Sequence, residues 1–143
     1  MKKADFHLAL PCDDLEATKD FYVSKIGASL GRHTDTWIDI NLFGNQITFT
    51  KAGNFSFDFK NYRLGDQVLP SFHFGVIVDV QIWGTLYSKL FSMDLEVTAE
   101  TTYFLNKTGE HLSFFVKDPN GYQVEFKSFK NENEVFESMD GLG

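Results

Sequence analysis

The chain has 143 residues, 43% of them hydrophobic, which is typical of one compact globular domain. Its formal net charge of −7 argues against nucleic acid or an anionic membrane as a partner, because both are bound through clustered cations. One cysteine excludes an internal disulfide, the opening MKKADFHLAL is too short and polar for a signal peptide, and no stretch approaches the about 20 apolar residues of a membrane span. We therefore expect a soluble, cytoplasmic protein.

The first part of the chain predicts one helix among four strands. Asp13 or Asp14 is expected to cap the helix, and Gly27 is expected to end it. Gly44-Asn45 marks a tight turn between the last two strands. In chain order, the strand, the helix and the three further strands are predicted over about residues 5–10, 14–26, 28–33, 36–42 and 45–51.

Residues 53–70 break this pattern and are predicted to be a long connector, and the pattern then returns. Asp118-Pro119-Asn120-Gly121 is expected to form the last hairpin turn. The second set of elements is a strand, a helix and three strands over about 71–78, 80–92, 95–105, 111–117 and 122–128. The apolar helix residues expected to pack are Ile82, Trp83, Leu86, Leu90 and Phe91.

The two halves are copies of one pattern, because Phe6-His7 and Phe72-His73 each open the first strand of their half. The predicted fold class is α+β, with two tandem βαβββ modules that form an open, incompletely closed eight-stranded barrel. The expected domain is residues 1–130, with modules at about 4–52 and 71–129. Residues 131–143 are expected to be an acidic tail with at most a short helix around 132–138.

Four polar residues occupy the face of the predicted strands that the apolar residues leave free. His7 and His73 lie at matching positions of the two first strands, and Gln46 and Glu125 lie at comparable positions of the two last strands. Polar side chains among apolar neighbours cost free energy unless they are paired or bind something. A single histidine on a strand is more often hydrogen-bonded in a core, but the repeated arrangement favours a divalent metal site. Two histidines and a carboxylate suit Fe(II), and Gln46 could supply a fourth contact.

The stretches FHLALPCDDLEATKDFY, FGNQITF, FHFGVIV and FFVKDPNGYQVEFKSF resemble the vicinal oxygen chelate superfamily over nearly the whole chain. This superfamily includes glyoxalase I, the extradiol dioxygenases, the fosfomycin-resistance thiol transferases and the bleomycin-binding proteins. The resemblance is greatest to a bacterial extradiol-dioxygenase-like subgroup. It implies that His7, His73 and Glu125 are metal ligands, and that Gln46 stands where glyoxalase I has a carboxylate.

The resemblance implies a ring-cleaving dioxygenase that acts on a small substrate whose adjacent oxygens chelate the metal. Fe(II) is the expected metal, with Mn, Ni or Zn as alternatives. His111 and Tyr103 are the candidates for an acid or base beside the metal, with Tyr62 a further one. A glyoxalase-type lyase or isomerase and a metal-free drug-binding protein of the bleomycin-resistance type remain the alternatives. A homodimer is expected, because the sheets leave edges to protect and family members usually pair.

Overall fold

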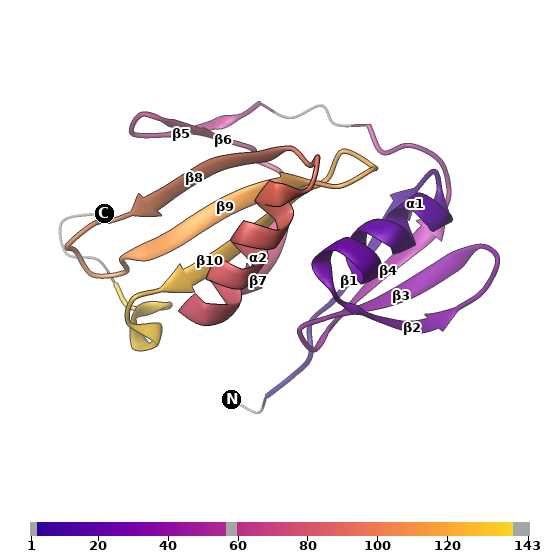
Figure 1. Ribbon diagram of the computed structural model, residues 1–143, viewed down its shortest axis with the longest axis horizontal. Helices are drawn as coiled ribbons and strands as arrows, with labels where there is room; N and C mark the ends of the chain where they lie inside the picture. Colours follow the sequence, from indigo (N-terminus) through magenta and orange to yellow (C-terminus); the bar gives the residue numbers. More distant parts are fainter. Residues whose placement is uncertain (1–2, 57–59, 139–143) are drawn as a thin grey trace. The chain divides into compact units, whose positions relative to one another are not determined.

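The computed structural model describes residues 3–56 and 60–138. The chain divides into two compact units, one made of Met1–Asp58 with Asp118–Tyr122 and one made of Phe59–Lys117 with Gln123–Gly143. Each unit holds a four-stranded sheet with a helix packed on it, and neither sheet closes into a barrel by itself (Figure 1). The predicted α+β class with two βαβββ modules is confirmed.

The sheet of the first unit has the strand order β1-β4-β3-β2, with β1 parallel to β4 and the other pairs antiparallel. The predicted first helix is present as an α-helical segment that continues into a π-helical one, because Asp20 follows Lys19 without a break. The elements are β1 (His7–Cys12), α1 (Leu15–Lys19), η1 (Asp20–Ile26), β2 (Ser29–His33), β3 (Trp37–Leu42) and β4 (Asn45–Lys51).

Local signals in this unit were mostly correct. Asp14 is the cap, since its side chain accepts a hydrogen bond from the Ala17 backbone N–H at 3.1 Å, and Gly27 ends the helix with φ 94°. The predicted turn Gly44-Asn45 was wrong by one residue. Phe43 and Gly44 have the positive φ angles of 52° and 88° that close the turn, and Asn45 is already the first residue of β4.

The sheet of the second unit has the order β7-β10-β9-β8, again with one parallel pair, β7 with β10. Its helix α2 contacts β10 and covers one face of this sheet (Figure 1). A two-stranded hairpin precedes it. The elements are β5 (Tyr62–Leu64), β6 (Gln67–Leu69), β7 (His73–Ile77), α2 (Val80–Ser92), β8 (Val97–Tyr103), β9 (His111–Lys117), β10 (Gln123–Phe129) and the 3-10 turn η2 (Glu132–Glu134).

Two expectations for this unit need correction. The connector 53–70 contains the hairpin β5–β6, whose turn begins at Gly65 with φ 59°. On α2, Trp83, Leu86 and Leu90 are buried, but Ile82 and Phe91 are 37% and 65% exposed. The buried positions form one stripe at helical spacing, and Ile82 and Phe91 lie beside it. No helix among the described residues is long and apolar enough to cross a membrane.

The turn Asp118–Tyr122 belongs to the first unit, where the buried carboxylate of Asp118 accepts a hydrogen bond from Tyr22 Oη at 2.7 Å. The backbone N–H groups of Asn120 and Tyr122 also donate to this carboxylate, each at 2.8 Å. Burial nevertheless raises the pKa of Asp118 above its ordinary value. The network closes the turn, but ionising this carboxyl group costs folding free energy.

We predict that Asp118→Asn changes the pH dependence of stability. A carboxyl group whose pKa is raised on folding contributes stability below its ordinary pKa, and this contribution is lost as the pH rises through the higher folded-state value. Asparagine keeps an acceptor for the two backbone N–H groups and does not ionise. Urea unfolding at several pH values between about 3 and 7 measures the free energy of unfolding of both proteins. The stability of the variant relative to the wild type should increase as the pH rises. A difference that is constant over this range would contradict the burial argument.

Candidate metal site

The parallel pair β7–β10 decides which side chains meet in the second unit. Its register places His73 opposite Gln123 and Gly75 opposite Glu125. Val124 and Phe126, which alternate with Glu125 along β10, are fully buried, and Trp83 of α2 donates to the Phe126 carbonyl at 3.0 Å. Since alternate strand residues face opposite sides, His73 and Glu125 share the face that α2 does not cover.

His73 Nε2 lies 3.3 Å from Glu125 Oε1. The other ring nitrogen, Nδ1, lies 2.6 Å from the Pro70 carbonyl oxygen. A carbonyl oxygen only accepts, so Nδ1 carries the proton, and Nε2 of neutral His73 turns its lone pair toward the carboxylate. Two acceptors this close need a proton or a cation between them. The hydrogen bond with Glu125 accordingly raises the pKa of His73.

Glu125 is 7% exposed, and its second carboxylate oxygen accepts a hydrogen bond from Ser113 Oγ at 2.7 Å. Burial acts to raise the pKa of Glu125, but the hydrogen bonds from His73 and Ser113 and the nearby charge of Lys127 outweigh it and hold the pKa below its ordinary value. Lys127 Nζ lies 3.7 Å from Oε1. Phe115 packs edge-on against the His73 ring at 5.0 Å. The carboxylate is therefore ionised, oriented and in part shielded from water.

These donors fit a divalent metal. Metal–ligand bonds of about 2.0–2.2 Å at a right angle place two donor atoms about 3 Å apart, close to the separation of His73 Nε2 and Glu125 Oε1. The bonds from His73 to Pro70 and from Ser113 to Glu125 are the outer contacts that fix ligand orientation. Within residues 3–56 and 60–138, no three His, Cys, Asp or Glu side chains gather at one point. The structure thus brings two of the predicted ligands together.

His7 lies in the first unit, on the face of β1 that corresponds to the position of His73 on β7. Its register partner is Gln46, and the register partner of Ala9 is Thr48. Because His73 is paired with Gln123 and Gly75 with Glu125, Gln46 corresponds to Gln123 in the repeat. The expectation that Gln46 and Glu125 are comparable was wrong, and Thr48 holds the position of Glu125.

Gln46 and Thr48 both bind Asp39, a buried carboxylate on the adjacent strand β3. Gln46 Nε2 donates to Asp39 Oδ2 at 3.1 Å, and Thr48 Oγ1 donates to Oδ1 at 2.7 Å. A carboxylate only accepts, so the amide of Gln46 must turn its nitrogen toward Asp39. Its oxygen is the atom left for any other ligand. Neither Gln46 nor Thr48 is a carboxylate, so β4 offers no carboxylate at the position where glyoxalase I has its fourth ligand.

His111 and Tyr103 lie on the same face of the second sheet as Glu125, because His111 pairs with Phe129 of β10 and Tyr103 of β8 pairs with His111. The His111 ring stacks between Tyr103 and Phe129, with centroids 5.2 and 4.6 Å away. Its Nδ1 is 2.8 Å from the Gly109 carbonyl oxygen, and burial lowers its pKa. His111 is thus neutral, with Nε2 as its basic nitrogen. Tyr62 is 55% exposed on the separate hairpin β5–β6.

Two buried side-chain polar atoms lack a hydrogen-bond partner in the described part of the chain, Tyr103 Oη and Gln123 Oε1. Both belong to the face that carries His73 and Glu125. Burial and the charge of Glu125 raise the pKa of Tyr103, so its hydroxyl keeps its proton. An unpaired buried polar atom is rare and needs an explanation. A bound ligand that supplies the missing partners is one.

Sequence reasoning missed Gln123, Lys127 and Ser113 on this face. The two-residue period of β10 could have indicated Gln123 and Lys127 from Glu125 alone. Ser113 follows only from the antiparallel register of β9 with β10. A cavity of about 260 Å³ is lined by His73, Glu125 and Lys127. A larger one of about 700 Å³ in the same unit is lined by His111 and by other residues near the start of β9, the end of β10 and the start of α2.

The fold and the paired donors define a two-module α+β protein with the elements of a metal-binding or small-molecule-binding face. The model of the Glyoxalase/Bleomycin resistance protein/Dioxygenase superfamily matches residues 6–126, and the chain belongs to this superfamily. This confirms the resemblance predicted from the sequence. No match is found among curated proteins.

Solved structures agree with this assignment. A glyoxalase/bleomycin resistance protein/dioxygenase from Alicyclobacillus acidocaldarius is 26% identical, with TM-score 0.77 and coverage of 93% of this chain and 96% of that one. The fosfomycin resistance protein FosX from Listeria monocytogenes is 13% identical, with TM-score 0.65 and coverage of 94% and 98%. The oxidase ChaP-H2 is 14% identical, with TM-score 0.64 and coverage of 90% and 94%. The last two share the fold.

We predict that Gly75→Ala is strongly destabilising, whereas Gly84→Ala is not. A Cβ at Gly75 would overlap the backbone of Glu125, which cannot move without breaking the β7–β10 pair. A Cβ at Gly84 on α2 meets open space, and alanine there should stabilise the helix by about 0.5–1 kcal/mol. Urea unfolding of both variants checks this. Equal stabilities would show that the close approach at Gly75 is unimportant.

Proposed function

We propose that this protein is a metal-dependent enzyme of the ring-cleaving dioxygenase type, acting on a small molecule with two adjacent oxygens. His7, His73 and Glu125 are its proposed protein ligands, and Fe(II) is the proposed metal. The observation that carries the proposal is the pair His73–Glu125, two acceptors that face each other at 3.3 Å and are each held by an outer hydrogen bond.

A divalent cation bound there would act as a Lewis acid that orients the adjacent substrate oxygens and lowers the pKa of a hydroxyl group. The remaining work falls to residues of the chain. Neutral His111 offers Nε2 to accept the substrate proton, because Nδ1 is bound to Gly109. Tyr103, still protonated, can donate from Oη to a substrate oxygen on which charge develops. The buried unpaired state of Oη supports this role.

The choice among reaction types is supported by the register of β4. A glyoxalase-type proton transfer is served by a second carboxylate, but Thr48 stands at the position that matches Glu125, and its hydroxyl is bound to Asp39. A set of two histidines and one carboxylate suits the dioxygenase type better. Gln46 stays a proposed fourth contact, through its amide oxygen. The free edges of the sheets favour the proposed homodimer, in which they could be covered.

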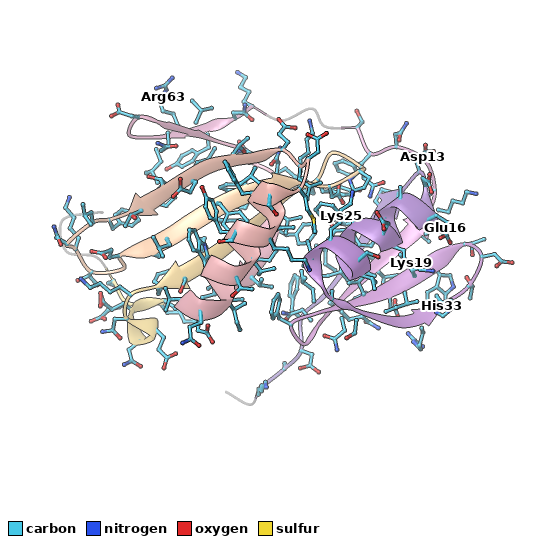
Figure 2. The ribbon with its side chains drawn as sticks, viewed as in Figure 1. Asp13, Glu16, Lys19, Lys25, His33 and Arg63 are labelled. Atoms are coloured by element: carbon cyan, nitrogen blue, oxygen red, sulfur yellow. The ribbon has the colours of Figure 1, made fainter. Side chains whose placement is uncertain are left out.

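We predict that anaerobically purified protein holds about one Fe per chain, and that His73→Ala and Glu125→Ala lose it. Removing either side chain leaves one of the two converging donors. Elemental analysis measures the metal, and circular dichroism checks the fold. His33→Ala is the matched control, because His33 is exposed at the end of β2 (Figure 2), and this variant should keep the metal.

Other results would redirect the proposal. Nickel or zinc in place of iron would favour a glyoxalase-type lyase or isomerase. Wild-type protein that takes up no metal, even after reconstitution, would favour a metal-free binding protein. Unchanged metal in His73→Ala would overturn the ligand assignment.

We predict that Tyr103→Phe separates stability from function. The hydroxyl that it removes is buried without a partner, so the free energy of unfolding should be unchanged or higher by up to about 3 kcal/mol. Turnover of a catechol substrate should fall by about 10²-fold or more, the cost of removing a donor to developing charge. Oxygen uptake and urea unfolding measure the two effects. If Tyr103→Phe lost stability but kept full turnover, the hydroxyl would have a structural role and no catalytic one.

A further inference from the structure

A β-bulge turns Arg32 toward the face of the first sheet that carries His7. Leu30 is paired with Ile40 and His33 with Ile38, so two residues of β2, Gly31 and Arg32, stand opposite the single residue between those partners on β3. In a regular strand, Arg32 would share the side of Leu30, which packs toward the helix. The bulge redirects the side chain.

The guanidinium group is held on two sides. Arg32 Nε donates to Asp39 Oδ2 at 3.2 Å, and the guanidinium carbon lies 5.6 Å from the centroid of the Trp37 ring. Gly31 leaves the space needed, since even a Cβ there would lie 3.3 Å from Asp39 Cβ. The Arg32 side chain is nevertheless 78% exposed, whereas that of Asp39 is 6% exposed. A long, exposed arginine is thus pre-oriented by a buried anion and an aromatic ring.

The terminal nitrogens of Arg32 are the part left free. Asp39 is its hydrogen-bond partner among the described residues, and that contact uses Nε. A guanidinium carries five N–H donors in a planar fork, so the two terminal groups keep four. Arg32 lines a cavity of about 430 Å³ together with His7 and Gln46. A pre-oriented fork with free donors is suited to bind a carboxylate through two parallel hydrogen bonds.

We propose that Arg32 recognises a carboxylate group of the substrate, so that the substrate is an acid that also carries the two adjacent oxygens. This inference rests on the proposed function, because those oxygens are assigned to the metal. The chain has a formal net charge of −7, which repels anions at long range, so a local cation is needed to favour an acidic substrate. Asp39 orients Arg32 and does not itself touch the substrate.

The test compares two probes that differ by one carboxylate, catechol and 3,4-dihydroxybenzoate. Binding to the metal-loaded protein is measured by anaerobic titration calorimetry. The wild type should bind 3,4-dihydroxybenzoate about tenfold or more tightly than catechol, as expected for a charge-assisted pair. Arg32→Gln should remove this preference and leave the catechol affinity unchanged. Arg63→Gln is the control, since it removes the other arginine, which lies on β5 (Figure 2), and it should keep the preference.

Arg32→Lys tests the proposal where Arg32→Gln does not fold. Lysine keeps the charge beside Asp39 but has no planar fork, so the preference should shrink several-fold while the protein stays folded. A wild-type preference that survives in Arg32→Gln or Arg32→Lys would overturn the assignment, and equal binding of both probes to the wild type would do the same. In both cases, a protein that still binds the metal and catechol would remain consistent with the proposed function. Failure of both probes to bind metal-loaded protein would overturn the dioxygenase-type function together with this inference.

Discussion

The parallel pairing of the first and last strands is the constraint on which both halves of this protein depend. In the second unit it sets Gly75 against Glu125 and brings His73 to the same face, and in the first unit it sets His7 against Gln46. Side chains alternate along a strand, so a slip of one residue would turn Glu125 toward α2 and the core. The apolar residues that alternate with these polar ones therefore hold the register, because their burial is lost if it changes. Packing on one side of the sheet determines the chemistry on the other.

The same backbone carries different chemistry in the two modules. In the second, a carboxylate on the last strand meets a histidine and is held by Ser113. In the first, threonine takes that position, and the buried carboxylate is Asp39 on the neighbouring strand, whose oxygens are occupied by Thr48, Gln46 and Arg32. A carboxylate already satisfied by three donors is a weak metal ligand but a firm anchor for a cation. The duplication thus allows the two modules to differ: in the proposed function the carboxylate ligand comes from the second module, and the carboxylate of the first module holds Arg32.

The sequence was sufficient for features that depend on local periodicity. The helices and the common face of His73 and Glu125 follow from spacings of about 3.6 residues and of two residues. The sequence did not show which residue of β4 corresponds to Glu125, because Gln46 and Thr48 lie on the same face of that strand. Only the pairing with β1 shows that Thr48 is the match. The bulge at Arg32 left no sequence signal, because an extra residue is defined only by its partner strand. Both of these features depend on long-range pairing, which the periodicity of a single strand does not contain.

The unpaired atoms Tyr103 Oη and Gln123 Oε1 give an energetic argument that this face of the second sheet binds a ligand. A buried polar atom without a partner costs about 1–3 kcal/mol, a large share of the stability of a small domain. Phenylalanine in place of Tyr103 would keep the stacking on His111 and avoid this cost, so packing alone does not account for the hydroxyl. Two such atoms on one face, beside a histidine and a glutamate that also need a cation or a proton between them, are most simply explained together. In the proposed function, a metal ion and the oxygen atoms of a substrate would supply these missing partners.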